Sequence, residues 1–237
     1  NGCDSDSLGI IRKTSRLQIL GKEKGKEMTG KTHLAVGTAA ALCVTQPPHL
    51  RDWVLCIGAA VVGSVISDVD VSTSDSREAL NKITAVSCLA FVVVVILECI
   101  FHLGILRNFN RESSLFRFII GFAVMLIVCT FGKNQPHRSF MHSILGLLIF
   151  SGIVAFMYPE VELYFAIAML SHILIDLLNK RKVRLLYPWG NGWCLRLCTA
   201  DGIVNTLLFW LGSAVAMIAS FWLVVSKYAP ELLKMLQ

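Results

Sequence analysis

Long, uninterrupted apolar segments constrain the fold of this chain more than any other feature of its sequence. They occupy residues 33–45, 53–67, 83–106, 115–132, 143–158, 161–178 and 202–226. A helix needs about 20 apolar residues to cross a bilayer, and the longest segments reach that length. Because apolar and polar residues do not alternate, strands with one buried face are not indicated. We therefore expect an all-α polytopic integral membrane bundle with four full spans, embedded in the lipid bilayer.

The composition argues against a soluble protein and against a nucleic-acid-binding one. Hydrophobic residues make up 55% of the 237 residues and charged residues only 16%, whereas soluble domains are more polar. The net charge of +6 fits loops retained in the cytoplasm. No basic stripe with interleaved aromatic residues is present, so we expect no nucleic-acid partner.

Two pairs of apolar segments are separated by short turns and predict helical hairpins. Pro47-Pro48 separates the first pair, and Tyr158-Pro159 separates the second. The segments 33–45 and 53–67 are shorter than a straight span. Short helices rich in small residues suit a hairpin that is re-entrant or packed within the bundle.

The stretch before the first apolar segment differs from the rest of the chain. Residues 1–27 are polar and basic and lack periodicity, so we expect a disordered N-terminal extension. Met28 would then begin the membrane domain, residues 28–237. A basic flank before a short apolar run also suits a signal peptide, but no small-residue cleavage site precedes Gln46-Pro47.

The eight cysteines do not indicate a disulfide framework. Most stand singly in apolar segments, where cysteine behaves as a small hydrophobic residue. Cys194 and Cys198 are four residues apart, but without a second pair they are a weak signal for zinc. We expect reduced thiols.

Polar residues gather at five places near the ends of the apolar segments. These are Thr32-His33, Asp68-Val69-Asp70, Pro136–Ser143, His172 with Asp176, and Asp201-Gly202. If the lysine-rich stretch before His33 is cytoplasmic and each segment is one crossing or hairpin arm, all five reach the cytoplasmic face. The basic run 180–184 reaches it too, as the positive-inside rule requires. Three arginines depart from this rule: Arg107, Arg111 and Arg117.

Two of these clusters have the spacing of metal ligands. His172 and Asp176 are four residues apart and share a helix face; they would bind one metal ion or satisfy each other. Asp68 and Asp70 place two carboxylates close together, where they repel each other unless a cation lies between them. Negative charge at a helix C-terminus also opposes the helix dipole. A cation would remove both costs.

The stretch Pro136–Ser143 combines two histidines with an arginine. Pro136 suits a helix start, which would place His142 in the first turns of the helix and His137 at its entry. Arg138 offers paired donors to an anionic group such as a phosphate. Asp201 would either cap the last helix or act at the site.

One further polar pair lies inside an apolar segment. Glu98 and His102 share a face of segment 83–106. Ionisable residues within a span are candidates for function. These two would pair helices or extend a pathway across the membrane.

Together, the clusters predict one metal ion or a close pair of ions. We expect Asp68, Asp70, His142, His172 and Asp176 to bind the metal, and His33 to join them or to bind a second ion. His137 and Asp201 would assist catalysis beside the ligands or bind a second ion, and Arg138 would orient an anionic substrate. The ligand set admits zinc, manganese, magnesium or iron. Such a site can activate water and stabilise charge on a phosphoryl or carbonyl group.

The order of these motifs resembles the YdjM-like family over residues 29 to about 205. The matching stretches are Thr32-His33-Leu-Ala-Val-Gly37, Gly63-Ser-Val-Ile-Ser-Asp68-Val-Asp70, His137-Arg138-Ser-Phe-Met-His142-Ser143, Ser171-His172 with Asp176, and Arg184-Leu-Leu-Tyr-Pro-Trp189. The chain departs from the family pattern at Ser67, Val71, Ser139 and Met141. The resemblance implies a multi-pass protein of the bacterial inner membrane with metal-dependent hydrolase activity.

Three functions fit the sequence. The first is a membrane-bound metal-dependent hydrolase whose site lies at the cytoplasmic face and acts on a lipid-like or phosphorylated substrate. The second is a transporter or metal-binding permease, although transporter sites usually lie at the bilayer midplane. The third is a non-catalytic membrane scaffold in which the polar clusters pair with one another and bind no metal.

Overall fold

A computed structural model describes residues 30–71, 77–85, 114–197 and 202–235. The described residues form an all-helical bundle, as predicted. Its helices are α2 (Gly30–Thr45), α3 (Leu50–Ile66), η1 (Ser67–Asp70), α5 (Ser114–Lys133), η2 (Phe140–His142), α6 (Ile144–Met157), α7 (Pro159–Leu178) and α8 (Ile203–Met235), where η marks a 3₁₀ turn. Residues 77–85 are also helical. Residues 86–106 of the apolar segment 83–106 lie outside the described residues, and they include Glu98 and His102.

Both expected hairpins are present. Residues 46–49 join α2 to α3, and the chain turns from α6 into α7 at Tyr158, with Pro159 in the first turn of α7. Proline suits that position because the N–H it lacks would have no partner within the helix. Cys56 and Cys129 are buried free thiols, and Cys43 and Cys194 are also unpaired.

The expectation that the second segment is shorter than a span is wrong. Helix α3 begins at Leu50, before the apolar run, and continues into the 3₁₀ turn η1. Together they make an apolar element of 21 residues, Leu50–Asp70. Among the described residues, the other helices long and apolar enough to cross a membrane are Ser114–Lys133, Pro159–Leu178 and Ile203–Leu223. Helix α6 has 14 residues, or about 21 Å at 1.5 Å per residue, which is less than the hydrocarbon thickness.

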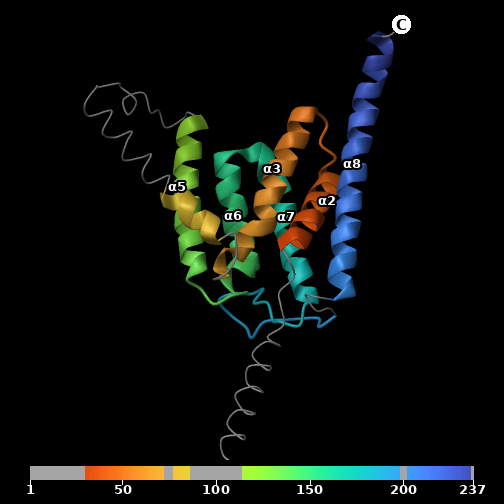
Figure 1. The fold of residues 1–237 in the computed structure, drawn as a ribbon. Helices are drawn as coiled ribbons and strands as arrows, with labels where there is room; N and C mark the ends of the chain where they lie inside the picture. Colours follow the sequence, from red (N-terminus) through yellow and green to blue (C-terminus); the bar gives the residue numbers. More distant parts are fainter. Residues whose placement is uncertain (1–29, 72–76, 86–113, 198–201, 236–237) are drawn as a thin grey trace, which may run out of the picture.

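The helices form a compact bundle with α5 and α8 at opposite sides (Figure 1). Helix α5 packs on α6, α6 on α7, α7 on both α3 and α2, and α8 on α2. Close packing depends on glycine at one crossing, because a Cβ on Gly63 would lie 2.5 Å from the Phe165 carbonyl oxygen of α7. Helices α5 and α8 expose apolar side chains such as Phe118, Ile127 and Phe221, which suits contact with lipid tails.

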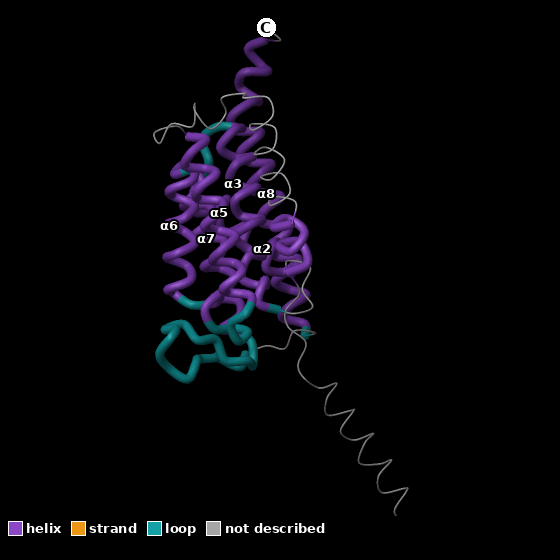
Figure 2. Tube along the Cα trace, turned by 90° about the vertical axis from the view of Figure 1, so that its left-hand side faces the viewer, coloured by secondary structure: helices purple, strands orange, loops and turns teal. Residues whose placement is uncertain are grey.

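The described polar clusters lie at one end of the bundle. Helices α2, α6 and α8 begin at this end, and α3, α5 and α7 end there, next to the loops 134–143 and 179–197 (Figures 1 and 2). Arg117 lies in the first turn of α5, at the other end. Asp201, Arg107 and Arg111 lie outside the described residues.

Candidate metal centre

Helix α7 presents the two residues that the sequence placed on one helix face. His172 and Asp176 are both buried, and His172 Nε2 lies 3.9 Å from Asp176 Oδ2. The four-residue spacing puts both side chains on one helix face. Contacts of His172 with His33, Ser64 and His142 direct this face toward α2, the end of α3 and the turn before α6. His172 and Asp176 form one wall of the candidate metal centre, the cluster that also contains His33, Asp68, Asp70 and His142.

His142 reaches the centre from a 3₁₀ turn, and the expectation that it lies in the first turns of a helix begun at Pro136 is wrong. Helix α6 begins at Ile144, because the Ser143 hydroxyl accepts a hydrogen bond from Gly146 N and caps the helix. Serine with extended backbone is a preferred cap. Arg138 has a φ of 61°, in the left-handed region, which also prevents a continuous helix from Pro136.

The imidazoles of His142 and His172 face each other at the middle of the centre. Their Nε2 atoms are 3.2 Å apart. His142 Nε2 also lies 3.0 Å from Asp176 Oδ2, and His172 Nε2 lies 3.6 Å from Asp68 Oδ1. Two histidines and two carboxylates therefore point toward one small volume.

The other ring nitrogen of each of these histidines faces an oxygen. His172 Nδ1 lies 2.6 Å from the Ser64 carbonyl oxygen, which can only accept, so this nitrogen donates. That carbonyl is in the last turn of α3, where helical carbonyls lack an intrahelical donor. His142 Nδ1 lies 3.4 Å from Asp70 Oδ2. Such contacts leave Nε2 as the nitrogen that can bind a metal.

His33 completes the wall that α2 contributes. It is buried, and its ring stacks on His172 with centroids 3.9 Å apart. His33 Nε2 lies 3.6 Å from Asp176 Oδ1. His33 Nδ1 forms no hydrogen bond within the described part of the chain. His33, His172 and Asp176 thus form a group whose ligand atoms lie close enough to share an ion.

Asp70 is directed toward the loop that carries His137. Its side chain is buried and lies 2.7 Å from His137 Nδ1, and it accepts a hydrogen bond of 3.1 Å from Arg138 N. Asp70 is therefore engaged with His137, with the Arg138 backbone and, at the longer distance given above, with His142. It orients the loop that presents His142.

The Arg138 guanidinium is buried within the centre. Its Nη2 donates to Asp176 Oδ1 at 2.9 Å and its Nη1 to the Arg181 carbonyl oxygen at 3.2 Å. These bonds hold Asp176 Oδ1 away from the pair of histidines, so that Oδ2 faces them. The Arg138 side chain is 2% exposed, so its terminal nitrogens serve the centre itself.

The charges of the centre favour a cation. Three carboxylates, those of Asp68, Asp70 and Asp176, surround a single guanidinium, which leaves two negative charges when the imidazoles are neutral. Without a metal ion, protons bound by the imidazoles compensate this negative charge. Burial alone would lower the pKa of His142, but hydrogen bonds to Asp176 and Asp70 outweigh it and raise that pKa to about 10.

The donor set fits a divalent ion. Ligands bound at about 2.0–2.2 Å around a tetrahedral ion lie roughly 3.3–3.6 Å from one another, and the facing nitrogens and carboxylate oxygens are separated by 3.0–3.9 Å. Two facing imidazole lone pairs repel each other unless a proton or a metal ion lies between them. Nitrogen and oxygen donors together suit zinc, iron or manganese.

Sequence reasoning missed the backbone acceptors and one helix contact. The carbonyls of Ser64 and Arg181 orient His172 and Arg138, and no side-chain pattern reveals a carbonyl. Thr32 Oγ1 donates to Asn205 Oδ1 at 2.8 Å and fixes α2 against α8. Asn205, a buried amide in an apolar segment, was a signal that could have been read.

Comparisons with known proteins agree with this architecture. The profile of the family described as YdjM inner membrane protein matches residues 28–232. No curated protein and no solved structure matches the chain. The family match covers most of the chain, and the helices within it include four candidate membrane spans. The chain belongs to the YdjM family of inner membrane proteins.

Proposed function

We propose that this protein is a metal-dependent hydrolase of the inner membrane whose centre opens at the cytoplasmic face. The observation that carries the proposal is the approach of His142 Nε2 and His172 Nε2 to 3.2 Å. His172 is held through Nδ1 by the Ser64 carbonyl, and His142 Nδ1 faces Asp70 Oδ2 at 3.4 Å, so Nε2 of each ring faces the same volume. Asp68 and Asp176 supply the charge that a divalent ion needs there.

The proposed ligands are His142, His172, Asp68 and Asp176, with His33 beside them. A divalent ion held there would act as a Lewis acid, lowering the pKa of water and neutralising charge that develops on a phosphoryl or carbonyl oxygen. Asp70 and Arg138 position these ligands, since their own contacts are with His137, His142 and Asp176. Asp201 stays a candidate for catalysis, outside the described residues.

His137 is the candidate for proton transfer. Its side chain is 23% exposed, whereas those of His142 and His172 are fully buried. Asp70 engages Nδ1 of His137, so the ring would transfer a proton through Nε2. That nitrogen is itself buried, so it would act on a group bound within the centre and not on bulk water. The carboxylate partner orients the ring and stabilises its charged form, as in other catalytic His–Asp pairs.

The position of the centre favours surface chemistry over transport. Its residues come from the first turn of α2, the end of α3, the last two turns of α7 and the loop before α6. Transporter sites lie near the bilayer midplane. A centre at one end of the spans suits a substrate with a polar group at the membrane surface, such as a phosphorylated or lipid-like molecule.

Elemental analysis of the detergent-purified protein tests the metal. The protein is purified without chelators, and Zn²⁺, Mn²⁺, Fe²⁺ or Mg²⁺ is added back. We expect about one ion per chain in the unmodified protein and in His49→Ala, because His49 is exposed in the α2–α3 turn. We expect almost none in the double variant His172→Ala/Asp176→Ala.

A screen of phosphoesters and lipid esters with the loaded protein then tests the hydrolase. Turnover that His137→Ala lowers by about 100-fold, with unchanged metal content, would support the proton-transfer role. Absence of metal in every preparation would favour a scaffold, and metal without turnover of any substrate would refute the hydrolase.

A further inference from the structure

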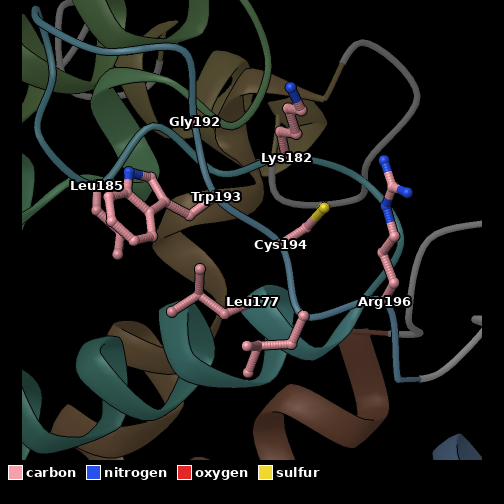
Figure 3. Close-up of a pocket in the computed structure, with 8 residues that line it drawn as sticks. Leu177, Lys182, Leu185, Gly192, Trp193, Cys194 and Arg196 are labelled. Atoms are coloured by element: carbon pink, nitrogen blue, oxygen red, sulfur yellow. The ribbon is translucent and has the colours of Figure 1, made fainter.

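A pocket lies beside the candidate metal centre, where α7 ends. It is a pocket of about 570 Å³ between the last turn of α7 and the loop 179–197 (Figure 3). The apolar wall of the pocket consists of Leu177, Leu185, Trp193 and Leu195. Its cationic side chains are Lys182 and Arg196. In the close-up, Trp193, Leu185 and Leu177 gather on one side, and the Lys182 amine and Arg196 guanidinium extend on the other.

Backbone bonds build this pocket and tie it to the metal centre. Val183 and Trp193 exchange two hydrogen bonds of 2.8 Å, which pair the two loop segments. Leu195 N and Leu197 N donate to the Leu177 and Leu178 carbonyls and so cap the end of α7. Arg184 N donates to the Arg138 carbonyl at 2.9 Å. The pocket therefore has a fixed shape and adjoins Asp176 through Leu177.

The two cations of the pocket are available to a ligand. Lys182 and Arg196 are exposed, and neither forms an ion pair with a carboxylate in the described ranges. Arg196 has a φ of 54°, a conformation that costs energy for a residue other than glycine. The hydrogen bonds of its neighbours Leu195 and Leu197 hold it there.

The surroundings of the pocket belong at the level of lipid headgroups. The candidate span Pro159–Leu178 ends at the pocket. Trp189 and Trp193 are 78% and 66% exposed, and exposed tryptophan beside a span is typical of the membrane interface. The loop also carries a cluster of basic residues: Lys180, Arg181, Lys182, Arg184 and Arg196. Basic clusters of this kind bind anionic lipids.

We propose that this pocket binds an anionic phospholipid of the surrounding leaflet. Lys182 and Arg196 hold the phosphate of the headgroup, and the Trp193 and Leu185 side of the pocket receives the first carbons of the acyl chains. Free inorganic phosphate would satisfy the two cations but not the apolar wall. The inference concerns binding alone, so it stands or falls separately from the proposed hydrolase.

Native mass spectrometry of the detergent-purified full chain measures this binding. Phosphatidylglycerol and phosphatidylcholine with the same acyl chains are titrated, and inorganic phosphate is added as a competitor. We expect phosphatidylglycerol to bind at least tenfold more tightly than phosphatidylcholine, since each cation near an anionic lipid contributes about 1 kcal/mol. Phosphate at equal concentration should not displace the lipid.

Matched variants locate the site. Lys182→Gln/Arg196→Gln should weaken phosphatidylglycerol binding by on the order of tenfold. Lys180→Gln/Arg184→Gln removes the same charge from the same loop, outside the pocket lining, and should weaken binding by less than about threefold. Trp193→Ala should weaken lipid binding while leaving the melting temperature near that of the unmodified protein, because its side chain is largely exposed.

Two results would overturn the proposal. Equal loss in the two double variants would show diffuse attraction by the basic loop instead of a pocket. Displacement of the lipid by phosphate at equal concentration would show a soluble anion as the ligand. Both results leave the metal content and any turnover of the protein as separate questions.

Discussion

His142 and His172 approach each other through Nε2, at 3.2 Å, while each ring faces an oxygen through Nδ1. One ring comes from the turn before α6 and the other from α7. The arrangement orients the Nε2 atoms of two imidazoles toward one point, which is the geometry that metal-binding histidines require. Asp68 and Asp176 face this point, whereas Asp70 faces Nδ1 of His142 and belongs, with His137 and His142, to a further group that could hold an ion.

Asp68 and Asp70 should therefore differ in their effects on metal binding. Asp68→Asn removes a proposed ligand, and we expect stoichiometric metal to be lost. Asp70→Asn changes a partner of His142 and His137, and such partners typically change metal affinity by about 10–100-fold. Competition with a chromophoric chelator measures both affinities. If Asp70→Asn loses the metal and Asp68→Asn keeps it, the two roles are exchanged.

The crossing of α3 and α7 should be sensitive to a single methyl group. A Cβ on Gly63 would lie 2.5 Å from the Phe165 carbonyl oxygen, whereas a Cβ on Gly58 of the same helix would meet nothing within 4 Å. Gly63→Ala should cost about 1–3 kcal/mol through overpacking. Gly58→Ala should be neutral or slightly stabilising, since alanine favours helix.

Gly63→Ala should also weaken metal binding, because Gly63 precedes the Ser64 carbonyl that orients His172. Thermal melting in detergent and a metal titration test these expectations. Equal melting temperatures for the two glycine variants would contradict the close packing of α3 on α7.

Metal binding and the stability of the metal-free protein should respond to pH in opposite directions. Burial alone would lower the pKa of His142, but the hydrogen bonds to Asp176 and Asp70 raise it from 6.5 to about 10. The folded metal-free protein thus holds a proton that the unfolded chain releases near pH 6.5. The resulting stabilisation is complete below pH 6.5 and is lost as pH rises through about 10.

A metal ion competes with that same proton, so its affinity should rise over the pH range in which the metal-free protein loses stability. Melting temperatures with and without Zn²⁺ between pH 6 and 9 would reveal both trends, and a weakly buffered titration would detect the released proton. In His142→Gln both slopes should flatten. Metal affinity independent of pH would exclude His142 as a ligand.

Arg138 should stabilise the metal-free protein more than the loaded one. Its guanidinium lies 2.9 Å from Asp176 Oδ1, with both groups buried. Removing one partner of a buried pair costs about 3–5 kcal/mol, so Arg138→Met should melt at a markedly lower temperature. Bound metal should reduce the deficit, because a divalent ion also compensates Asp176.

Arg138→Lys is the matched variant for this contact. It keeps the positive charge but has a single nitrogen in place of the two that reach Asp176 and the Arg181 carbonyl, so it should recover only part of the stability. An unchanged melting temperature in Arg138→Met would contradict the buried pair.

The sequence by itself determined the helical segments, their turns and the end of the bundle at which the described polar residues meet. Apolar runs, Pro47-Pro48 and Tyr158-Pro159 set these features locally, and the four-residue spacing of His172 and Asp176 fixed their common face. These properties depend on helix geometry and on the cost of placing polar backbone in lipid. They need no knowledge of neighbouring helices.

Only the tertiary structure decided which contacts the candidate site residues make. It places Arg138 against Asp176, Asp70 against His137, and the Ser64 carbonyl against His172. It also begins α6 at Ile144, through the Ser143 cap, so that His142 lies in a turn. The contacts of Arg138, Asp70 and Ser64 join residues 38 to 108 positions apart. Contacts between such distant residues depend on how the helices pack and on which donor finds which acceptor, and the local spacing of residues does not contain that information.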